Sequence, residues 1–142
     1  MGKMSDNRMT FDQLVEHQRR NRARRRPDDE EHRIQCACVN WFRLQYPDHA
    51  SALFAVPNGG RRDRVSGAKL KAEGVLPGVS DLILLVARRG CYGLLIEMKT
   101  PKGKQSPAQK EWARDMAARG YLYIVCHSFD EFRQAIDDYL LL

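Results

Sequence analysis

The chain has 142 residues, a formal net charge of +6 at pH 7 and 43% hydrophobic residues, so we expect one soluble domain that attracts polyanions. Its apolar runs, such as residues 82–87, are far shorter than the roughly 20 residues of a membrane helix. The N-terminus carries no apolar signal-peptide stretch, so we predict a cytoplasmic protein without a membrane partner.

The four cysteines lack the paired two-residue spacing of a zinc knuckle. Each lies in an apolar segment, so we expect buried free thiols. A zinc site built from Cys36, Cys38 and either His32 or His127 is the weaker alternative.

Residues 1–27 are polar and rich in arginine, and we interpret them as a flexible N-terminal arm. Six arginines and no acid lie between residues 19 and 26, which equals the net charge of the whole chain. Residues 9–20 could form a helix when bound. A disordered tail and a DNA-binding helix both remain open, and either would attract phosphates in a salt-dependent way.

From residue 28 onward, helical and extended patterns alternate. Asp28 is a plausible N-cap for a helix that runs to about residue 46, and Glu30 and Glu31 favour the positive end of its dipole. The further elements that we predict are a strand over 52–56, a helix over 66–73, a hairpin of strands 82–87 and 91–98, a helix over 107–120, a strand over 121–126 and a helix over 129–139. This order predicts an α/β fold with a mixed central β-sheet flanked by helices.

The hairpin brings the strongest candidate functional residues together. If it is symmetric about Arg89, Asp81 lies opposite Glu97, with Cβ atoms about 4.5–5.5 Å apart. Because side chains alternate along a strand, Glu97 and Lys99 share one face while Ile96 points into the core. Both acids and the lysine should therefore converge on one site.

Two neighbouring carboxylates repel each other unless a cation lies between them, and a hard divalent ion such as Mg²⁺ suits their oxygen atoms. Such an ion keeps several waters and accepts substrate phosphate, which indicates phosphodiester hydrolysis. Lys99 could orient or deprotonate the attacking water, or neutralise the phosphate. An ordinary solvated strand pair is the alternative, but the apolar run 94–96 and the turn at 77–80 favour a site.

Four segments together resemble the PD-(D/E)XK phosphodiesterase superfamily, and more narrowly the stand-alone VRR-NUC domains of phages and bacteria. These segments are residues 31–35, residues 57–60 with the arginines that follow, residues 74–81, and residues 97–99 with 106–109. The resemblance covers roughly residues 29 to 142. It implies a restriction-endonuclease-like αβββαβ core and a nuclease domain over residues 28–142.

Carried over by position, the resemblance assigns the metal-binding acids to Asp81 and Glu97 and the catalytic lysine to Lys99. The backbone carbonyl of Met98 would complete the metal shell. Gln109 matches a family glutamine that helps to shape the site.

Two positions of the family pattern are matched less directly: the acid of the first helix and the residue before Asp81. The acid of the first helix falls on Glu31, with Glu30 as the fallback, and in such enzymes it reaches the metal through water or a second ion. The residue before Asp81, usually proline in this family, is Ser80. Since Pro77 already stiffens the turn, we expect only a slight change of geometry.

Two loops rich in cations are candidates for contacts with the DNA backbone, although ordinary exposed loops would have the same composition. The DNA-binding candidates are Asn58, Arg61, Arg62, Arg64, Lys102 and Lys104.

The preferred hypothesis is a Mg²⁺- or Mn²⁺-dependent, structure-selective DNA endonuclease in phage or prophage replication, recombination or repair, located in the cytoplasm of a bacterial or phage-infected cell. The resemblance implies a homodimer similar to Holliday-junction resolvases, and products with a 5′-phosphate and a 3′-hydroxyl. The alternatives are a noncatalytic DNA-binding accessory protein on a nuclease fold and, less favoured, a sequence-specific restriction-type enzyme. The complete set of two acids and a lysine argues against the noncatalytic protein, and we see no added sequence-reading domain in so short a chain, which disfavours the restriction-type enzyme.

Overall fold

A computed structural model describes residues 10–23, 27–57 and 64–141 of the chain. Four strands form one sheet in the order β1-β2-β3-β4. Strand β2 pairs antiparallel with β1 and β3, whereas β4 pairs parallel with β3, so the sheet is mixed as predicted. The strands are β1 Leu53–Ala55, β2 Leu82–Leu84, β3 Leu94–Met98 and β4 Leu122–Cys126.

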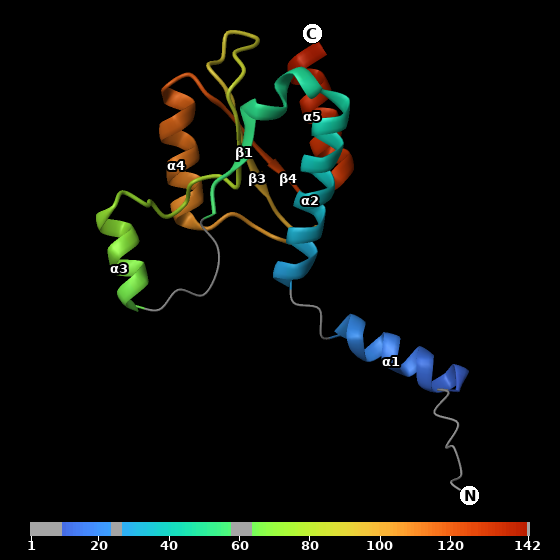
Figure 1. The fold of residues 1–142 in the computed structure, drawn as a ribbon. Coiled ribbons are helices and arrows are strands. Elements are labelled where there is room, and N and C mark those ends of the chain that lie inside the picture. Colours follow the sequence, from blue (N-terminus) through green and yellow to red (C-terminus); the bar gives the residue numbers. More distant parts are fainter. Residues whose placement is uncertain (1–9, 24–26, 58–63, 142) are drawn as a thin grey trace, which may run out of the picture.

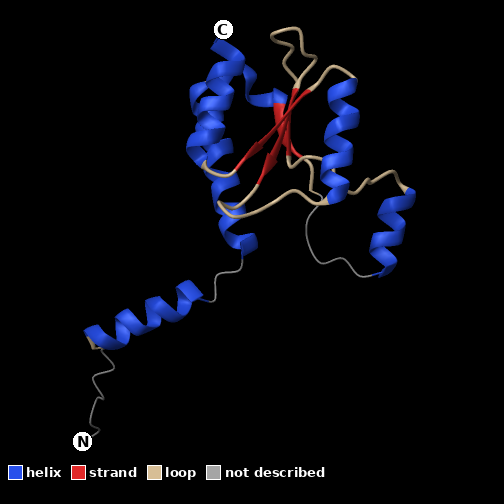
Figure 2. Cartoon of the chain, turned by 180° about the vertical axis from the view of Figure 1, so that it is seen from behind, coloured by secondary structure: helices blue, strands red, loops and turns tan. Residues whose placement is uncertain are grey.

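Helices cover both faces of this sheet. Figures 1 and 2 show α4 on one side of the strands, and α2 with α5 on the other. The order α2, β1, β2, β3, α4, β4 is the predicted αβββαβ core, with α3 inserted between β1 and β2. The helices are α1 Phe11–Ala23, α2 Pro27–Gln45, the short 3-10 helix η1 Pro47–Ala52, α3 Arg64–Ala72, α4 Pro107–Ala118 and α5 Phe129–Leu141.

The main hydrophobic core lies between the sheet and the helices α2 and α5. Helix α2 contributes Cys38 and Phe42, which are four residues apart and therefore lie on one face of the helix. Every second residue of the central strands points into the same layer, as the alternation predicted. The buried residues from the strands and from α5 are Leu82, Leu84, Leu94, Ile96, Met98, Phe132, Ile136 and Tyr139.

One prediction about the N-terminal segment was wrong, and another stays open. Residues 9–20 were predicted to be able to form a helix on binding, and α1 covers residues 11–23. Thr10 and Gln13 cap it reciprocally, because the backbone N–H of each donates to the side-chain oxygen of the other, at 2.9 and 3.3 Å. Asp28 is not an N-cap, since α2 already begins at Pro27, a residue type suited to a first helical turn. The division into an arm and a nuclease domain stays a prediction.

The hairpin between β2 and β3 is less regular than predicted. Its ladder pairs Leu82 with Ile96 and Leu84 with Leu94, which is the register expected for symmetry about Arg89. The turn itself is centred between Arg89 and Gly90, because the last bridge joins Arg88 to Cys91. The strand that enters the turn therefore carries one more residue than the strand that leaves it. Both strands are consequently shorter than predicted.

The cysteines are all free, but they are not all buried. Cys38 and Cys126 lie in the core, Cys91 is half-buried, and Cys36 is exposed on α2, contrary to the prediction. Within the described ranges, no group of three or more His, Cys, Asp or Glu side chains is placed to hold a metal ion. In the same ranges, no helix combines the length and the apolar character of a membrane span.

Candidate active site

The register of the hairpin places the two predicted acids together. Continuing the β2–β3 pairing by one residue beyond Leu82 and Ile96 brings Asp81 opposite Glu97. The Oδ2 atom of Asp81 accepts a hydrogen bond of 2.8 Å from the backbone N–H of Met98. Asp81 therefore caps the open end of β2 and holds its carboxyl group against the end of β3.

Glu97 is a charged residue in the interior of the protein, with only 1% of its surface exposed. Its Oε1 atom accepts a hydrogen bond of 2.8 Å from Nε2 of Gln109 and lies 3.2 Å from Nζ of Lys99. Its Oε2 atom is buried and accepts no hydrogen bond from an N–H or hydroxyl group of the described residues, although the carboxyl groups of Glu97 and Asp81 hydrogen-bond to each other when one of them is protonated. A buried carboxylate oxygen without such a donor is costly, so this atom needs an explanation.

Helix α4 fixes the orientation of Gln109. Ser106 is the N-cap, and its Oγ accepts from the backbone N–H of Gln109 at 3.2 Å. In return, Oε1 of Gln109 accepts from the backbone N–H of Ser106 at 2.8 Å. This capping box occupies the oxygen of the Gln109 amide, so the NH₂ group of the same amide points to Glu97.

The turn before Asp81 packs directly on the start of α4. Gly78 has a φ of +86°, and a Cβ atom at this position would lie 2.5 Å from the carbonyl oxygen of Ala108. Only glycine permits this approach. Ser80, expected to alter the geometry slightly, is fully buried, and its Oγ donates to the carbonyl oxygen of Leu82 at 3.2 Å. The turn and α4 therefore position Asp81 and Gln109 together.

Burial raises the pKa of both acids. The pKa of Glu97 rises from its ordinary value of 4.5 to about 7, through burial first and the Asp81 carboxylate second, with Lys99 acting in the opposite direction. The pKa of Asp81 is also raised by burial, and the hydrogen bond from Met98 partly offsets this effect. In the chain alone, keeping both groups ionised is therefore unfavourable.

The donor set fits a hard divalent cation. Asp81 and Glu97 supply carboxylate oxygens on adjacent strands, and the buried Oε2 atom of Glu97 has capacity for a further partner. The backbone of Met98 is turned toward Asp81, as its hydrogen bond shows. With only two carboxylates in the hairpin, such an ion would take the rest of its shell from backbone, water and substrate.

The other predicted site residues lie on α2, on α3 and on the loop after β3, or fall outside the described residues. Glu31 is half-buried near the start of α2, a helix that packs against β3. Figures 1 and 2 show the loop after β3 running beside this part of α2. Lys102 and Lys104 are exposed on that loop. Asn58, Arg61 and Arg62 lie outside the described residues, and Arg64 is the first residue of α3.

Tyr123 on β4 is a neighbour of the site that the sequence analysis missed. Its hydroxyl oxygen accepts from Nε2 of Gln105 at 3.2 Å, and its ring meets Trp112 edge-on at 6.1 Å. Burial raises the pKa of Tyr123 to about 12, and the charges of Glu97 and Asp81 add to the shift. The alternation of side chains along β4 could have identified it. Tyr123 pairs with Leu95, so both side chains lie on the face of the sheet that α4 covers.

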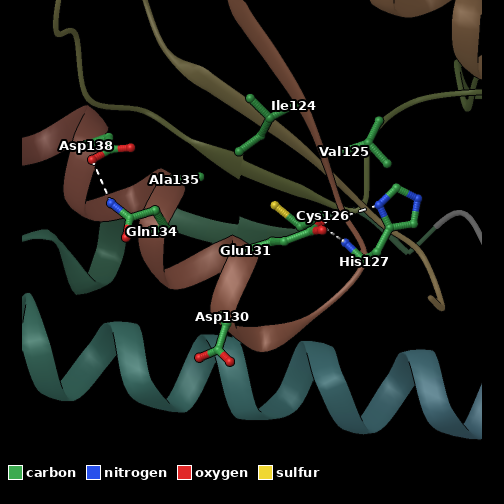
Figure 3. Close-up of a pocket in the computed structure, with 9 residues that line it drawn as sticks. All are labelled: Ile124, Val125, Cys126, His127, Asp130, Glu131, Gln134, Ala135 and Asp138. Carbon is green, nitrogen blue, oxygen red and sulfur yellow. Dashed lines mark hydrogen bonds and ion pairs between the residues drawn. The ribbon is translucent and has the colours of Figure 1, made fainter.

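His127, considered in the sequence analysis only as an alternative zinc ligand, holds the loop after β3. Its Nε2 atom lies 3.2 Å from the carbonyl oxygen of Gly103, and its Nδ1 atom lies 3.4 Å from Oε2 of Glu131. Figure 3 shows His127 beside Glu131, at one end of a groove of about 650 Å³ between β4 and α5. These contacts tie the loop that carries Lys102 and Lys104 to α5.

A mixed sheet with two acids and a lysine at the end of its central hairpin defines the class of a nuclease-type, DNA-processing domain. The VRR-NUC domain family matches residues 12–130 of the chain. A solved structure named "VRR_NUC domain protein" is 30% identical in sequence, with a TM-score of 0.70 over 79% of this chain and 88% of that chain. No curated protein matches. The chain belongs to the VRR-NUC domain family.

Proposed function

We propose that this protein is a divalent-metal-dependent deoxyribonuclease that hydrolyses phosphodiester bonds at the site of Asp81, Glu97 and Lys99. One observation carries this proposal. Glu97 is buried beside a second acid, and one of its carboxylate oxygens accepts no hydrogen bond from an N–H or hydroxyl group of the described residues. Keeping this carboxyl group ionised near neutral pH costs stability, and buried acids with raised pKa values are concentrated at functional sites.

In this proposal Asp81 and Glu97 hold Mg²⁺ or Mn²⁺ between them, with the carbonyl of Met98 and, through water, Glu31 as further ligands. When bound, the ion supplies a more acidic water and offsets negative charge on the phosphate. Gln109 keeps the carboxylate of Glu97 in one orientation through its hydrogen bond. Lys99 forms an ion pair with Glu97, and we assign it the role of neutralising an incoming phosphate.

The reaction is the attack of water on a phosphorus atom of the DNA backbone. The new bond joins the water oxygen to phosphorus, and the bond from phosphorus to the 3′ oxygen breaks. The products are a 5′-phosphate and a 3′-hydroxyl. Asn58, Arg61, Arg62, Arg64, Lys102 and Lys104 are the proposed contacts with the DNA backbone.

A comparison of variants tests the enzyme. The native protein, Lys99→Ala and Glu97→Gln should be assayed on labelled four-way junction, flap and linear duplex with Mg²⁺, Mn²⁺ or EDTA. Glu111→Gln is the matched control, because Glu111 is an exposed acid on α4. We expect metal-dependent cleavage by the native protein and the control, and none by the two site variants.

The preferred substrate would define the class of nuclease, and we propose structure-selective cleavage in phage or prophage DNA metabolism. Tight DNA binding without cleavage in every metal would instead support a noncatalytic accessory protein. A homodimer, which would allow two sites to cut two strands, is part of the proposal. Sedimentation that shows only monomer at micromolar concentration with a junction present would remove it.

A further inference from the structure

The loop that joins β3 to α4 folds back onto Lys99. The backbone N–H of Gly103 donates to the carbonyl of Thr100 at 2.9 Å, which closes a turn in this loop. A Cβ atom added at Gly103 would lie 3.2 Å from Cβ of Lys99 and 3.1 Å from Oγ1 of Thr100. Both separations are shorter than an ordinary contact between nonbonded carbon atoms. Because residue 103 has no side chain, the loop can lie directly on the stem of Lys99.

The side chain of Lys99 is held in one place as a result. It is only 14% exposed, and its Nζ atom lies 3.2 Å from Oε1 of Glu97. A lysine side chain has a flexible four-carbon stem and loses much rotamer freedom when its ammonium group is fixed. Packing of the loop on the stem opposes this loss. The position of the loop therefore bears on the position of the ammonium group.

His127 holds the loop at Gly103. Its Nε2 atom lies 3.2 Å from the carbonyl oxygen of Gly103. Since a carbonyl oxygen can only accept, Nε2 is the donor in this contact. The register of β3 and β4 pairs Met98 with Cys126, and the backbone N–H of Lys99 donates to the carbonyl of Cys126 at 2.9 Å. His127 is thus the residue that follows on β4 where Lys99 follows on β3.

Helix α5 fixes the imidazole from the other side. The backbone N–H of His127 donates to Oε2 of Glu131 at 2.6 Å, and Nδ1 lies 3.4 Å from the same oxygen, as Figure 3 shows. Glu131 stands in the first turn of α5, where its backbone N–H donates to Oγ of Ser128 at 3.1 Å. The side chain of His127 is 35% exposed, so it is not part of the hydrophobic core. Its polar contacts, rather than its packing, define what it does.

We propose that His127 is a positioning residue for Lys99, which keeps the loop closed on the stem of Lys99 and thereby holds the ammonium group at Glu97. This role rests on the proposed function of the site. His127 acts through Gly103 and not on the reacting atoms. Loss of the hydrogen bond to Gly103 should therefore free Lys99 and slow the chemical step, while the affinity for DNA stays the same.

The chemical reactivity of Lys99 tests this role without any cleavage. The native protein, His127→Asn and His127→Gln should be treated briefly with acetic anhydride in EDTA. Acetylation of Lys99 should then be measured by mass spectrometry relative to Lys110, an exposed lysine on α4. The amide nitrogen of Asn corresponds to Nδ1 of histidine and does not reach Gly103, whereas that of the longer Gln corresponds to Nε2.

A second histidine provides the matched control. His49→Asn changes a half-buried histidine on η1, and η1 leads into the end of β1 that pairs with Leu84, away from the two acids. We expect acetylation of Lys99 to rise about fivefold in His127→Asn, as for the loss of one hydrogen bond. His127→Gln and His49→Asn should stay close to the native protein. Equal acetylation of Lys99 in His127→Asn and the native protein would overturn the role, as would an equal rise in His127→Gln.

Steady-state kinetics distinguish this role from one in DNA binding, because the same loop carries Lys102 and Lys104. His127→Asn should lower kcat about fivefold and leave KM unchanged. The double variant Lys102→Ala, Lys104→Ala should instead raise KM. A loss in His127→Asn that is confined to KM would assign His127 to the DNA contacts of the loop and overturn its role toward Lys99.

The two measurements also separate His127 from the nuclease. Greater acetylation of Lys99 in His127→Asn, with a native protein that never cleaves DNA, would support control of Lys99 by His127 and refute the enzyme. Normal metal-dependent cleavage with equal acetylation in both proteins would do the opposite.

Discussion

The two ends of the same hairpin carry charge in opposite ways. At the open end, Glu97 is 1% exposed and its carboxylate is held by Gln109 and Lys99. At the turn, Arg88 and Arg89 are exposed and form no ion pair within the described ranges. A buried charge costs stability unless it is compensated, whereas an exposed charge costs almost nothing. The side chains at the open end are therefore held in one geometry, whereas the charges at the turn stay solvated.

The largest effect that sharpens this contrast is the pH dependence of stability. The pKa of Glu97 lies at about 7 in the folded chain, above its ordinary value of 4.5, so the folded state binds the proton more tightly. Its contribution to stability is complete below pH 4.5 and is lost as the pH rises through 7. In EDTA, the native protein should gain up to about 3 kcal/mol relative to Glu97→Gln on going from pH 8 to pH 4.5.

Urea unfolding of both proteins at several pH values measures this difference. Saturating Mg²⁺ should abolish it, because a bound cation favours the ionised carboxylate. Parallel pH profiles of the native protein and Glu97→Gln in EDTA would show that burial of Glu97 has no energetic consequence.

The second effect concerns the packing that positions the open end. Gly78→Ala places a Cβ atom against Ala108 and strains a φ of +86°, so we expect a loss of about 2 kcal/mol in the free energy of unfolding. Cleavage should fall as well, since the turn carries Asp81. Gly67→Ala is the matched control, because a Cβ atom there meets nothing within 4 Å and alanine favours the helix. A loss no larger than that of the control would contradict the tight contact.

The third effect is on the orientation of Glu97. Gln109→Ala removes the side-chain amide that donates to Glu97, and we expect cleavage to fall by about 10–100-fold, as for other residues that orient a metal ligand. Ser106→Ala weakens the helix cap but leaves the amide donor to Glu97. Steady-state kinetics should therefore show a much smaller loss for Ser106→Ala. Comparable losses would mean that Gln109 acts only through the cap.

The smallest effect concerns the turn. Arg89 has a φ of 53°, and Arg89→Asn relieves this left-handed strain, so the free energy of unfolding should rise by about 0.5–1 kcal/mol. Thermal unfolding of this variant beside Arg88→Ala, whose φ is not positive, measures the gain. A less stable Arg89→Asn protein would show that the arginine side chain supports the fold.

Local patterns in the sequence account for the features of the hairpin that could be predicted. The alternation of apolar residues around Ile96 is a local property, and it placed Glu97 and Lys99 on one face. The ladder register followed from the same alternation, because a shift by one residue would turn the apolar side chains of both strands to the wrong face. The asymmetric turn was missed, since one extra residue outside the ladder leaves no trace in the apolar pattern.

The parts of the site that depend on contacts between distant segments were harder to predict from the sequence. Gln109 was proposed only through the family resemblance, because its contact with Glu97 spans twelve positions and depends on how α4 packs. Tyr123 and His127 were missed for the same reason, since their partners come from other elements of the fold. The exposure of Cys36 was missed although helix geometry contains the signal, because Cys36 lies two positions before the buried Cys38 and therefore on nearly the opposite face of α2.

The sequence by itself determined the order of helices and strands, the mixed sheet, and the pairing of two acids with a lysine at one end of a hairpin. These features depend on residue type and on spacings of a few positions, so they follow from local side-chain patterns. Only the tertiary structure decided that Glu97 is buried, that one of its oxygens accepts no hydrogen bond from an N–H or hydroxyl group of the described chain, and that the loop after β3 lies on Lys99. Burial and distant contacts depend on how whole elements pack, because the interior excludes water only after the layers have come together.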